Sequence, residues 1–154
     1  MKIILTIGEL HLAAQNGSLR QIESMSRGLP DKHGFDGPGW NVHIEGAAGE
    51  IAAAKALGVF WGGSVNTFKS EGDIGNFEIR TTSTKNNRLI VRNGDNDNAI
   101  FVLVVGRAPT YEVVGWMRGK DAKQEKYVSA PGGRPPAYFV PRSDLNPIES
   151  LRGS

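Results

Sequence analysis

The sequence predicts one domain of the α/β (α+β) class, in which helices flank a central mixed, mostly antiparallel sheet. The length of 154 residues is typical of a single domain that can bury its own core. Apolar residues recur at helical spacing before residue 58, and two-residue alternation dominates after residue 63. We divide the chain into an N-terminal helical part (1–39), a core (40–128) and a C-terminal extension (129–154).

Two capping patterns predict two short helices in the N-terminal part. Thr-x-x-Glu at residues 6–9 starts the first helix, which we expect to end at Asn16-Gly17. Ser-x-x-Gln at residues 18–21 starts the second helix, which Gly28 closes. Residues 29–39, rich in proline and glycine, form a loop.

The strongest helical pattern covers residues 40–57 and ends at Gly58. Gly46 and Gly49 lower its intrinsic helix propensity. Together with several alanines, they predict a helix that packs very closely against a sheet.

Short alternating segments then predict strands. Residues 64–69 and 77–82 form two strands, joined by a tight turn at 71–76. A hairpin turn at Asn86-Asn87 leads into a strand over residues 88–92.

The second half of the chain contains the most apolar segment. Residues 100–105 are uniformly apolar, which predicts a central strand covered on both faces. Further strands are expected at 111–118 and 137–140, a short charged helix at 119–126, and a turn or helix at 142–151.

Composition limits the classes of function. The chain has no cysteine, which excludes disulfides and thiolate zinc sites and fits a cytoplasmic protein. No apolar run approaches the length of a membrane span, so no membrane partner is expected. The net charge of +2 permits a polyanionic partner without requiring one.

Three carboxylates and an arginine form the main candidate site. Glu50 lies mid-helix among small apolar residues, where an unpartnered carboxylate is costly. Asp73 lies in a glycine-rich turn, and Glu78 and Arg80 share one face of the next strand. Closely spaced carboxylates repel each other unless a hard cation such as Mg²⁺ lies between them.

The order of these residues resembles the PD-(D/E)XK nucleases, a family with the restriction-endonuclease-like fold. The matching segments are GEIAAAKALG around Glu50, EGDIGN around Asp73, and NFEIRTTST, which contains Glu78-Ile79-Arg80. The resemblance covers roughly the middle 60% of the chain, residues 40–128, by its order of elements. The sequence as a whole also resembles those of small bacteriophage-encoded proteins of this fold.

The resemblance implies a divalent-metal-dependent DNA endonuclease. Asp73, Glu78 and the Ile79 carbonyl would bind Mg²⁺ or Mn²⁺, and Glu50 would bind a second metal or its water. Arg80 replaces the family's lysine; it can stabilise an anionic transition state but cannot act as a base. The alternative is therefore a catalytically inactive module on the same fold that binds DNA or a protein partner. An enzyme that cuts both strands would be expected to act as a homodimer.

Other interpretations of these residues stay open. Glu78 and Arg80 could form a solvated strand face, paired with each other or with Arg92. Asp73 could be an ordinary turn residue, and Glu50 could pair with a lysine at the helix surface. The segment 95–98, DNDN, resembles the start of a calcium loop, but a polar turn is favoured because the later ligands are absent. His33, Asp36 and His43 follow no known zinc spacing.

Two groups of basic residues are candidates for nucleic-acid binding, because lysine and arginine contact phosphates without regard to sequence. The alternative is ordinary solvated surface. The candidate residues are Lys85, Arg88, Arg92, Lys120 and Lys123, with Arg118 and Lys126 beside the last two.

Overall fold

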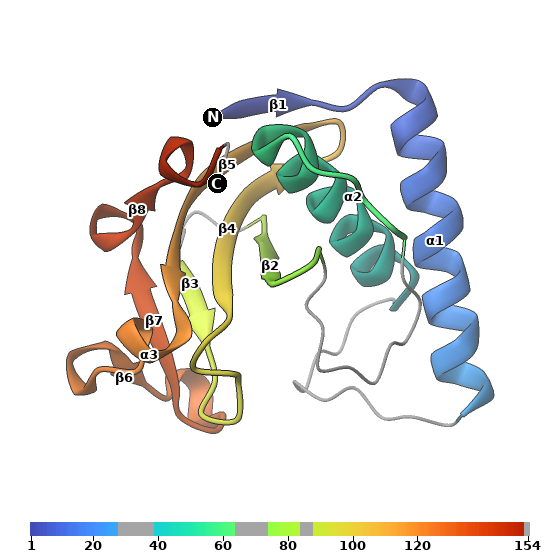
Figure 1. Ribbon diagram of the computed structural model, residues 1–154. Helices are drawn as coiled ribbons and strands as arrows, with labels where there is room; N and C mark the ends of the chain where they lie inside the picture. The colour runs from blue at the N-terminus through green and yellow to red at the C-terminus, as the bar shows by residue number, and fades with distance from the viewer. Residues whose placement is uncertain (28–38, 64–73, 84–87, 153–154) are drawn as a thin grey trace.

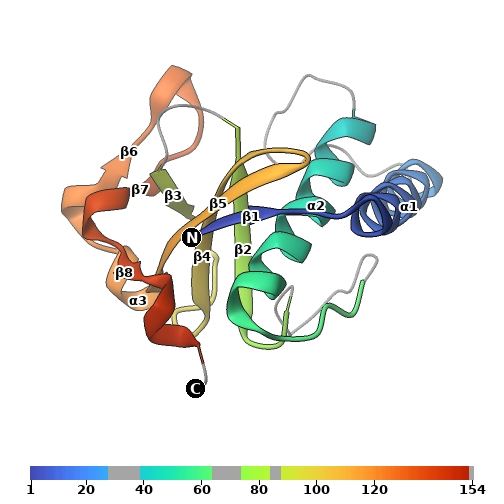
Figure 2. The same cartoon turned by 90° about the horizontal axis from the view of Figure 1, so that it is seen from above.

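The molecule has three layers: two long helices, a central sheet and a second sheet (Figures 1 and 2). The computed structural model describes residues 1–27, 39–63, 74–83 and 88–152. The helices are α1 (Ile7–Ser26), α2 (Gly39–Leu57) and the short α3 (Gly119–Ala122). The strands are β1 (Lys2–Ile4), β2 (Phe77–Thr82), β3 (Arg88–Val91), β4 (Ile100–Arg107), β5 (Thr110–Arg118), β6 (Val128–Ser129), β7 (Ala137–Pro141) and β8 (Asn146–Pro147). Short 3₁₀ turns lie at Glu125–Tyr127, Pro131–Gly133, Arg142–Asp144 and Ile148–Leu151.

The central sheet, sheet A, is mixed. Its order is β1-β5-β4-β2, with β8 also paired to β5. β2 runs parallel to β4, and the other pairs are antiparallel. The second sheet, sheet B, has the antiparallel order β3-β7-β6. The predicted fold class, a mixed and mostly antiparallel sheet with flanking helices, is confirmed.

β4 separates two hydrophobic cores, as its uniform apolar sequence predicted. Val102 and Val104 belong to the core between sheet A and α2. Phe101 and Leu103 belong to the core between sheets A and B. Successive side chains of a strand point to opposite faces, so one strand serves both cores.

The predicted pair of N-terminal helices is wrong, because α1 is one continuous helix. It begins with the predicted capping box at Thr6 and runs through Asn16 and Gly17. A Cβ on Gly17 would lie 2.5 Å from the Cα of Ile44 in α2, so this glycine permits a close helix contact. Asn16 Nδ2 donates to the Gly63 carbonyl at 2.6 Å. Gly17 therefore permits packing between helices and Asn16 joins α1 to the segment after α2, so the Asn-Gly pair does not end the helix.

The predicted hairpin between residues 77–82 and 88–92 is also wrong. β2 pairs with β4, and β3 pairs with β7 in the other sheet. Leu89 and Val91 are fully buried between the sheets, which explains the apolar alternation without pairing to β2. Alternation indicates a strand with one buried face, but it does not identify the neighbouring strand.

Other elements follow the prediction more closely. α2 ends as expected at Gly58, whose φ is +70°. The segment predicted as a helix at 119–126 forms α3 and a 3₁₀ turn. β7 is the strand predicted at 137–140, although it is not the last, because the short β8 follows it. β1 was not predicted, and the expected strand at 64–69 lies outside the described residues. None of the helices described is both long and apolar enough to cross a membrane.

Candidate functional site

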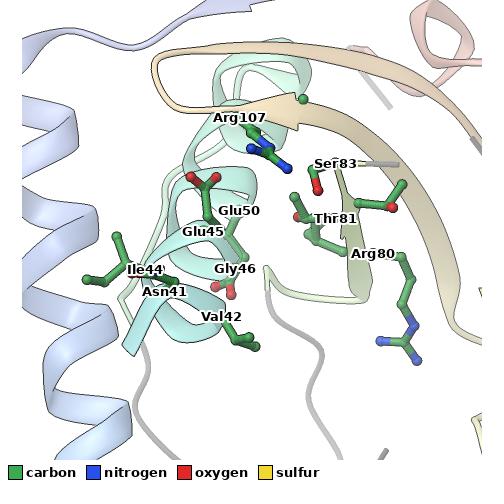
Figure 3. A pocket seen from close by; sticks show the side chains of 13 residues that line it. Asn41, Val42, Ile44, Glu45, Gly46, Glu50, Arg80, Thr81, Ser83 and Arg107 are labelled. Carbon is green, nitrogen blue, oxygen red and sulfur yellow. The ribbon is translucent and has the colours of Figure 1, made fainter. Parts of the chain in front are cut away.

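A cavity of about 890 Å³ lies between α2 and β2 (Figure 3). We call it the helix–strand cavity. It is lined by Asn41, Val42, Ile44, Glu45, Gly46, Glu50, Ile79, Arg80, Thr81, Thr82, Ser83, Gly106 and Arg107. Gly49 brings α2 directly onto β2, since a Cβ there would lie 2.0 Å from Thr81 Oγ1. This contact confirms the close helix–sheet packing that the small residues predicted.

Glu50 is buried in this region, and both of its carboxylate oxygens have partners. Arg20 binds it with two hydrogen bonds, Nη1 to Oε2 at 2.6 Å and Nη2 to Oε1 at 2.9 Å. The Trp61 indole Nε1 also donates to Oε1, at 3.2 Å. A two-pronged guanidinium contact is the strongest neutralisation that a side chain offers a buried carboxylate. Glu50 therefore joins α1, α2 and the segment after α2.

Glu78 and Arg80 lie on the face of β2 that is turned away from α2. Ile79, between them, is buried in the helix-side core. The Arg80 guanidinium lies 5.0 Å from the centre of the Phe101 ring and points away from α2 (Figure 3). The strand thus separates Glu50 from Glu78 and Arg80, because neighbouring residues of a strand face opposite sides.

The Arg80 side chain is held in place from three directions. Its Nε donates to the Ile90 carbonyl at 3.2 Å, and its Nη2 binds Asp95 Oδ2 at 2.9 Å. Its Nη1 lies 3.7 Å from Glu78 Oε2. The sequence predicted the proximity of Glu78 and Arg80, but not the role of Asp95.

The described residues hold only part of the predicted Mg²⁺ or Mn²⁺ centre, which stays a prediction. Within the described ranges, no group of three or more His, Asp or Glu side chains is placed to hold a metal ion. The Glu50 oxygens already bind a cationic side chain, and Glu78 lies on the other side of β2. Asp73, like His33 and Asp36 of the zinc alternative, lies outside the described residues.

The segment that resembled a calcium loop binds a lysine ammonium instead. Lys123 Nζ lies 3.0 Å from the Asn93 carbonyl, 2.6 Å from the Asp95 carbonyl and 2.6 Å from Asp97 Oδ1. The favoured interpretation, a polar turn, agrees with this arrangement. Lys123 was predicted to bind nucleic acid, but its ammonium group binds two carbonyl oxygens and a carboxylate of the same chain. Lys120 of α3 is exposed, and Lys85 lies outside the described residues.

A smaller hollow of about 280 Å³ lies on the other side of β2. We call it the arginine hollow, after Arg80, Arg88 and Arg92. Its full lining is Ile79, Arg80, Thr81, Thr82, Arg88, Ile90, Arg92 and Leu103. Because Leu89 and Val91 of β3 point into the core, the alternate residues Arg88, Ile90 and Arg92 face this hollow.

The cations of the arginine hollow are only partly neutralised. Arg80 is paired with Asp95 and Glu78. Among the described residues, no carboxylate forms an ion pair with the guanidinium of Arg88 or Arg92. Burial, followed by repulsion from Arg80, lowers the pKa of Arg92, although Asp95 opposes the shift. An arginine stays protonated under such a shift, so the hollow is electropositive.

Glu45, which lines the helix–strand cavity, is paired with the buried Tyr111, and the sequence did not indicate this pair. The Tyr111 hydroxyl donates to Glu45 Oε2 at 2.5 Å. Burial, and then the hydrogen bond to Glu45, raises the pKa of Tyr111. These residues are far apart in the chain and belong to no motif, so only the fold brings them together.

The chain matches no protein-family model, no curated protein and no solved structure. The resemblance to PD-(D/E)XK nucleases therefore depends on the residues named above and on their order alone.

Proposed function

We propose that this protein binds nucleic acid through the arginine hollow, in the manner of a binding module. The observation that supports the proposal is the convergence of Arg80, Arg88 and Arg92, from two different sheets, on one recess. Phosphate is the natural anion for such a group, since guanidinium donors match its oxygens in pairs.

Two features of the hollow favour a bound phosphate over simple solvated surface. Ile90 and Leu103 line the hollow beside the cations, which reduces the screening of their charge by water. Arg88 and Arg92 lack a carboxylate partner among the described residues, so binding would not require an ion pair to break.

The test is the salt dependence of binding to a fluorescent single-stranded or duplex oligonucleotide. Each lost phosphate contact lowers the slope of log K against log salt by about 1. We expect that reduction for Arg88→Ala and for Arg92→Ala. Lys2→Ala is the matched control, because β1 lies at the opposite edge of sheet A from β2. An equal loss of affinity in all three variants would mean that only net charge matters, and the proposal would be wrong.

A metal-dependent DNA endonuclease of PD-(D/E)XK type is the second candidate. It is favoured by Glu78 and Arg80, which lie two residues apart on β2, 3.7 Å from each other and beside the hollow. The test is nicking of supercoiled plasmid with Mg²⁺, Mn²⁺ or EDTA. Metal-dependent nicking that disappears in Glu78→Gln would support this candidate. If the protein binds DNA but does not nick it under any condition, the nuclease candidate is wrong and the binding-module proposal stands.

A further inference from the structure

The helix–strand cavity and the arginine hollow share residues 79–82 of β2 in their linings. Within the described part of the chain, β2 is the last strand of sheet A at this end, so both spaces lie beside the same strand edge. The hollow presents three guanidinium groups, whereas the larger cavity includes hydroxyl, amide and carboxylate side chains in its lining. A nucleic-acid strand with a phosphate in the hollow therefore lies beside a polar cavity of about 890 Å³.

Gly46 leaves the α2 wall of this cavity open. Glycine inside a helix lowers its stability relative to alanine, so its presence there calls for a reason. At Gly49 the reason is the close contact with Thr81. A Cβ on Gly46, by contrast, would meet no described atom within 4 Å outside its own stretch of helix. Packing does not require this glycine, and the space beside it is available to a ligand.

Glu45 offers that space a hydrogen-bond acceptor (Figure 3). Its Oε2 accepts from the Tyr111 hydroxyl, and no described residue donates to its Oε1. Burial and this hydrogen bond raise the pKa of Tyr111, so the hydroxyl keeps its proton and remains the donor. A carboxylate oxygen accepts from the exocyclic amino group of a base such as cytosine, whereas thymine presents a carbonyl oxygen at the same place.

We propose that the helix–strand cavity takes up an unpaired base of the strand whose phosphate binds in the arginine hollow, and that Glu45 selects bases with an exocyclic amino group. The inference deepens the proposed function and rests on it. Arg107 also lines the cavity, and it forms no ion pair with a described residue. Its guanidinium offers a contact to the next phosphate of the strand.

The experiment compares single strands of equal length, each with a fluorophore at one end, at mildly alkaline pH. One strand is all cytosine, one is all thymine, and one consists of stable abasic residues with the same phosphates. We expect cytosine to bind about tenfold more tightly than thymine, the effect of one hydrogen bond to a charged group, and the abasic strand to bind least tightly. Annealed to their complements, the cytosine and thymine strands should bind equally, because paired bases stay in the stack.

Variants assign the preference to the cavity. In Glu45→Gln the Tyr111 hydroxyl retains the amide oxygen as its acceptor, so the amide N–H₂ group replaces Oε1 and the preference should reverse toward thymine. Glu112→Gln makes the same change at an exposed β5 residue outside the described linings, and it should behave as wild type. Gly46→Leu should fold normally, because leucine is the better helix former, but its side chain should block the cavity and remove the differences between strands.

The outcomes separate this inference from the function on which it rests. Equal, salt-dependent binding of all three single strands would overturn the base site and leave nucleic-acid binding intact. No binding of any strand would overturn both. A cytosine preference that persists in Glu45→Gln and Gly46→Leu would overturn the assignment to the cavity, and one that persists in the duplexes would overturn the choice of an unpaired base. If free cytidine monophosphate competes at the same concentration as the cytosine strand, the ligand is a single nucleotide and the choice of a strand is wrong.

Discussion

The stability of the Glu50→Ala variant shows whether Glu50 has a structural or a catalytic role. In the structure, Glu50 is 5% exposed and the Arg20 side chain is 14% exposed, and two hydrogen bonds join them. Glu50→Ala removes the carboxylate that accepts two hydrogen bonds from the Arg20 guanidinium and one from the Trp61 indole. Loss of one partner from a buried pair costs about 3–5 kcal/mol.

Thermal and urea unfolding measure this cost directly. For a chain of this size, 1 kcal/mol shifts Tm by roughly 2–4 °C, so we expect a decrease of roughly 6–20 °C. Arg20→Ala should cost a similar amount. The double variant should cost clearly less than the sum, because the two side chains depend on each other.

An opposite result would refute this reasoning. A catalytic carboxylate is commonly held at the expense of stability, so its removal leaves the fold unchanged or more stable. If Glu50→Ala unfolds at the wild-type temperature or above it, the ion pair to Arg20 does not hold the helices together. The predicted role of Glu50 beside a metal would then regain support.

Three further changes test other parts of the structure. Gly49→Ala should destabilise the fold by about 1–3 kcal/mol in urea unfolding, because its Cβ would overlap Thr81, and Thr81→Gly in the same chain should recover part of the loss. Lys123→Met should lower the unfolding temperature but leave oligonucleotide affinity unchanged, since its ammonium binds only within the protein; a selective loss of affinity would restore it as a nucleic-acid contact. The hydrogen bond to Asp144 and burial raise the pKa of Tyr127 from 10.0 to about 12, so the neutral hydroxyl stabilises the fold below pH 10 and this contribution disappears between pH 10 and about 12. Tyr127→Phe should flatten the loss of stability over that interval, and an unchanged alkaline profile would contradict the assignment.

The sequence predicted most elements because their signals are local. The caps of α1 and α2, the uniformly apolar β4 and the alternation of β2 and β3 each depend on a few neighbouring residues. Pairing depends instead on residues far apart in the chain. β2 was therefore placed beside β3 when it pairs with β4, and β1 was missed because its partner β5 is more than 100 residues away.

The candidate site was predicted only in part, because some of its features depend on local sequence and others on long-range packing. That Glu78 and Arg80 share a face follows from strand periodicity alone. The position of Glu50 on the other side of β2 depends on which face of the sheet α2 covers. The position of Arg88 and Arg92 beside Arg80 depends on how sheet B packs against sheet A. The buried position of Glu50 did indicate a partner, but the identity of that partner, Arg20, required the packing of α1 on α2.

Because β1 pairs with β5, sheet A cannot be completed until late in the synthesis of the chain. α1 and α2 are close in the chain and contact each other extensively, so they can pack as soon as they are made. Residues 2–4 must wait for residues 110–112, which follow on the order of ten seconds later at ordinary translation rates. Until β2 and β4 have been made, the face of α2 that packs against sheet A has no strand to cover it. A nascent chain of this protein should therefore depend on chaperones mainly before β5 is complete, and much less afterwards.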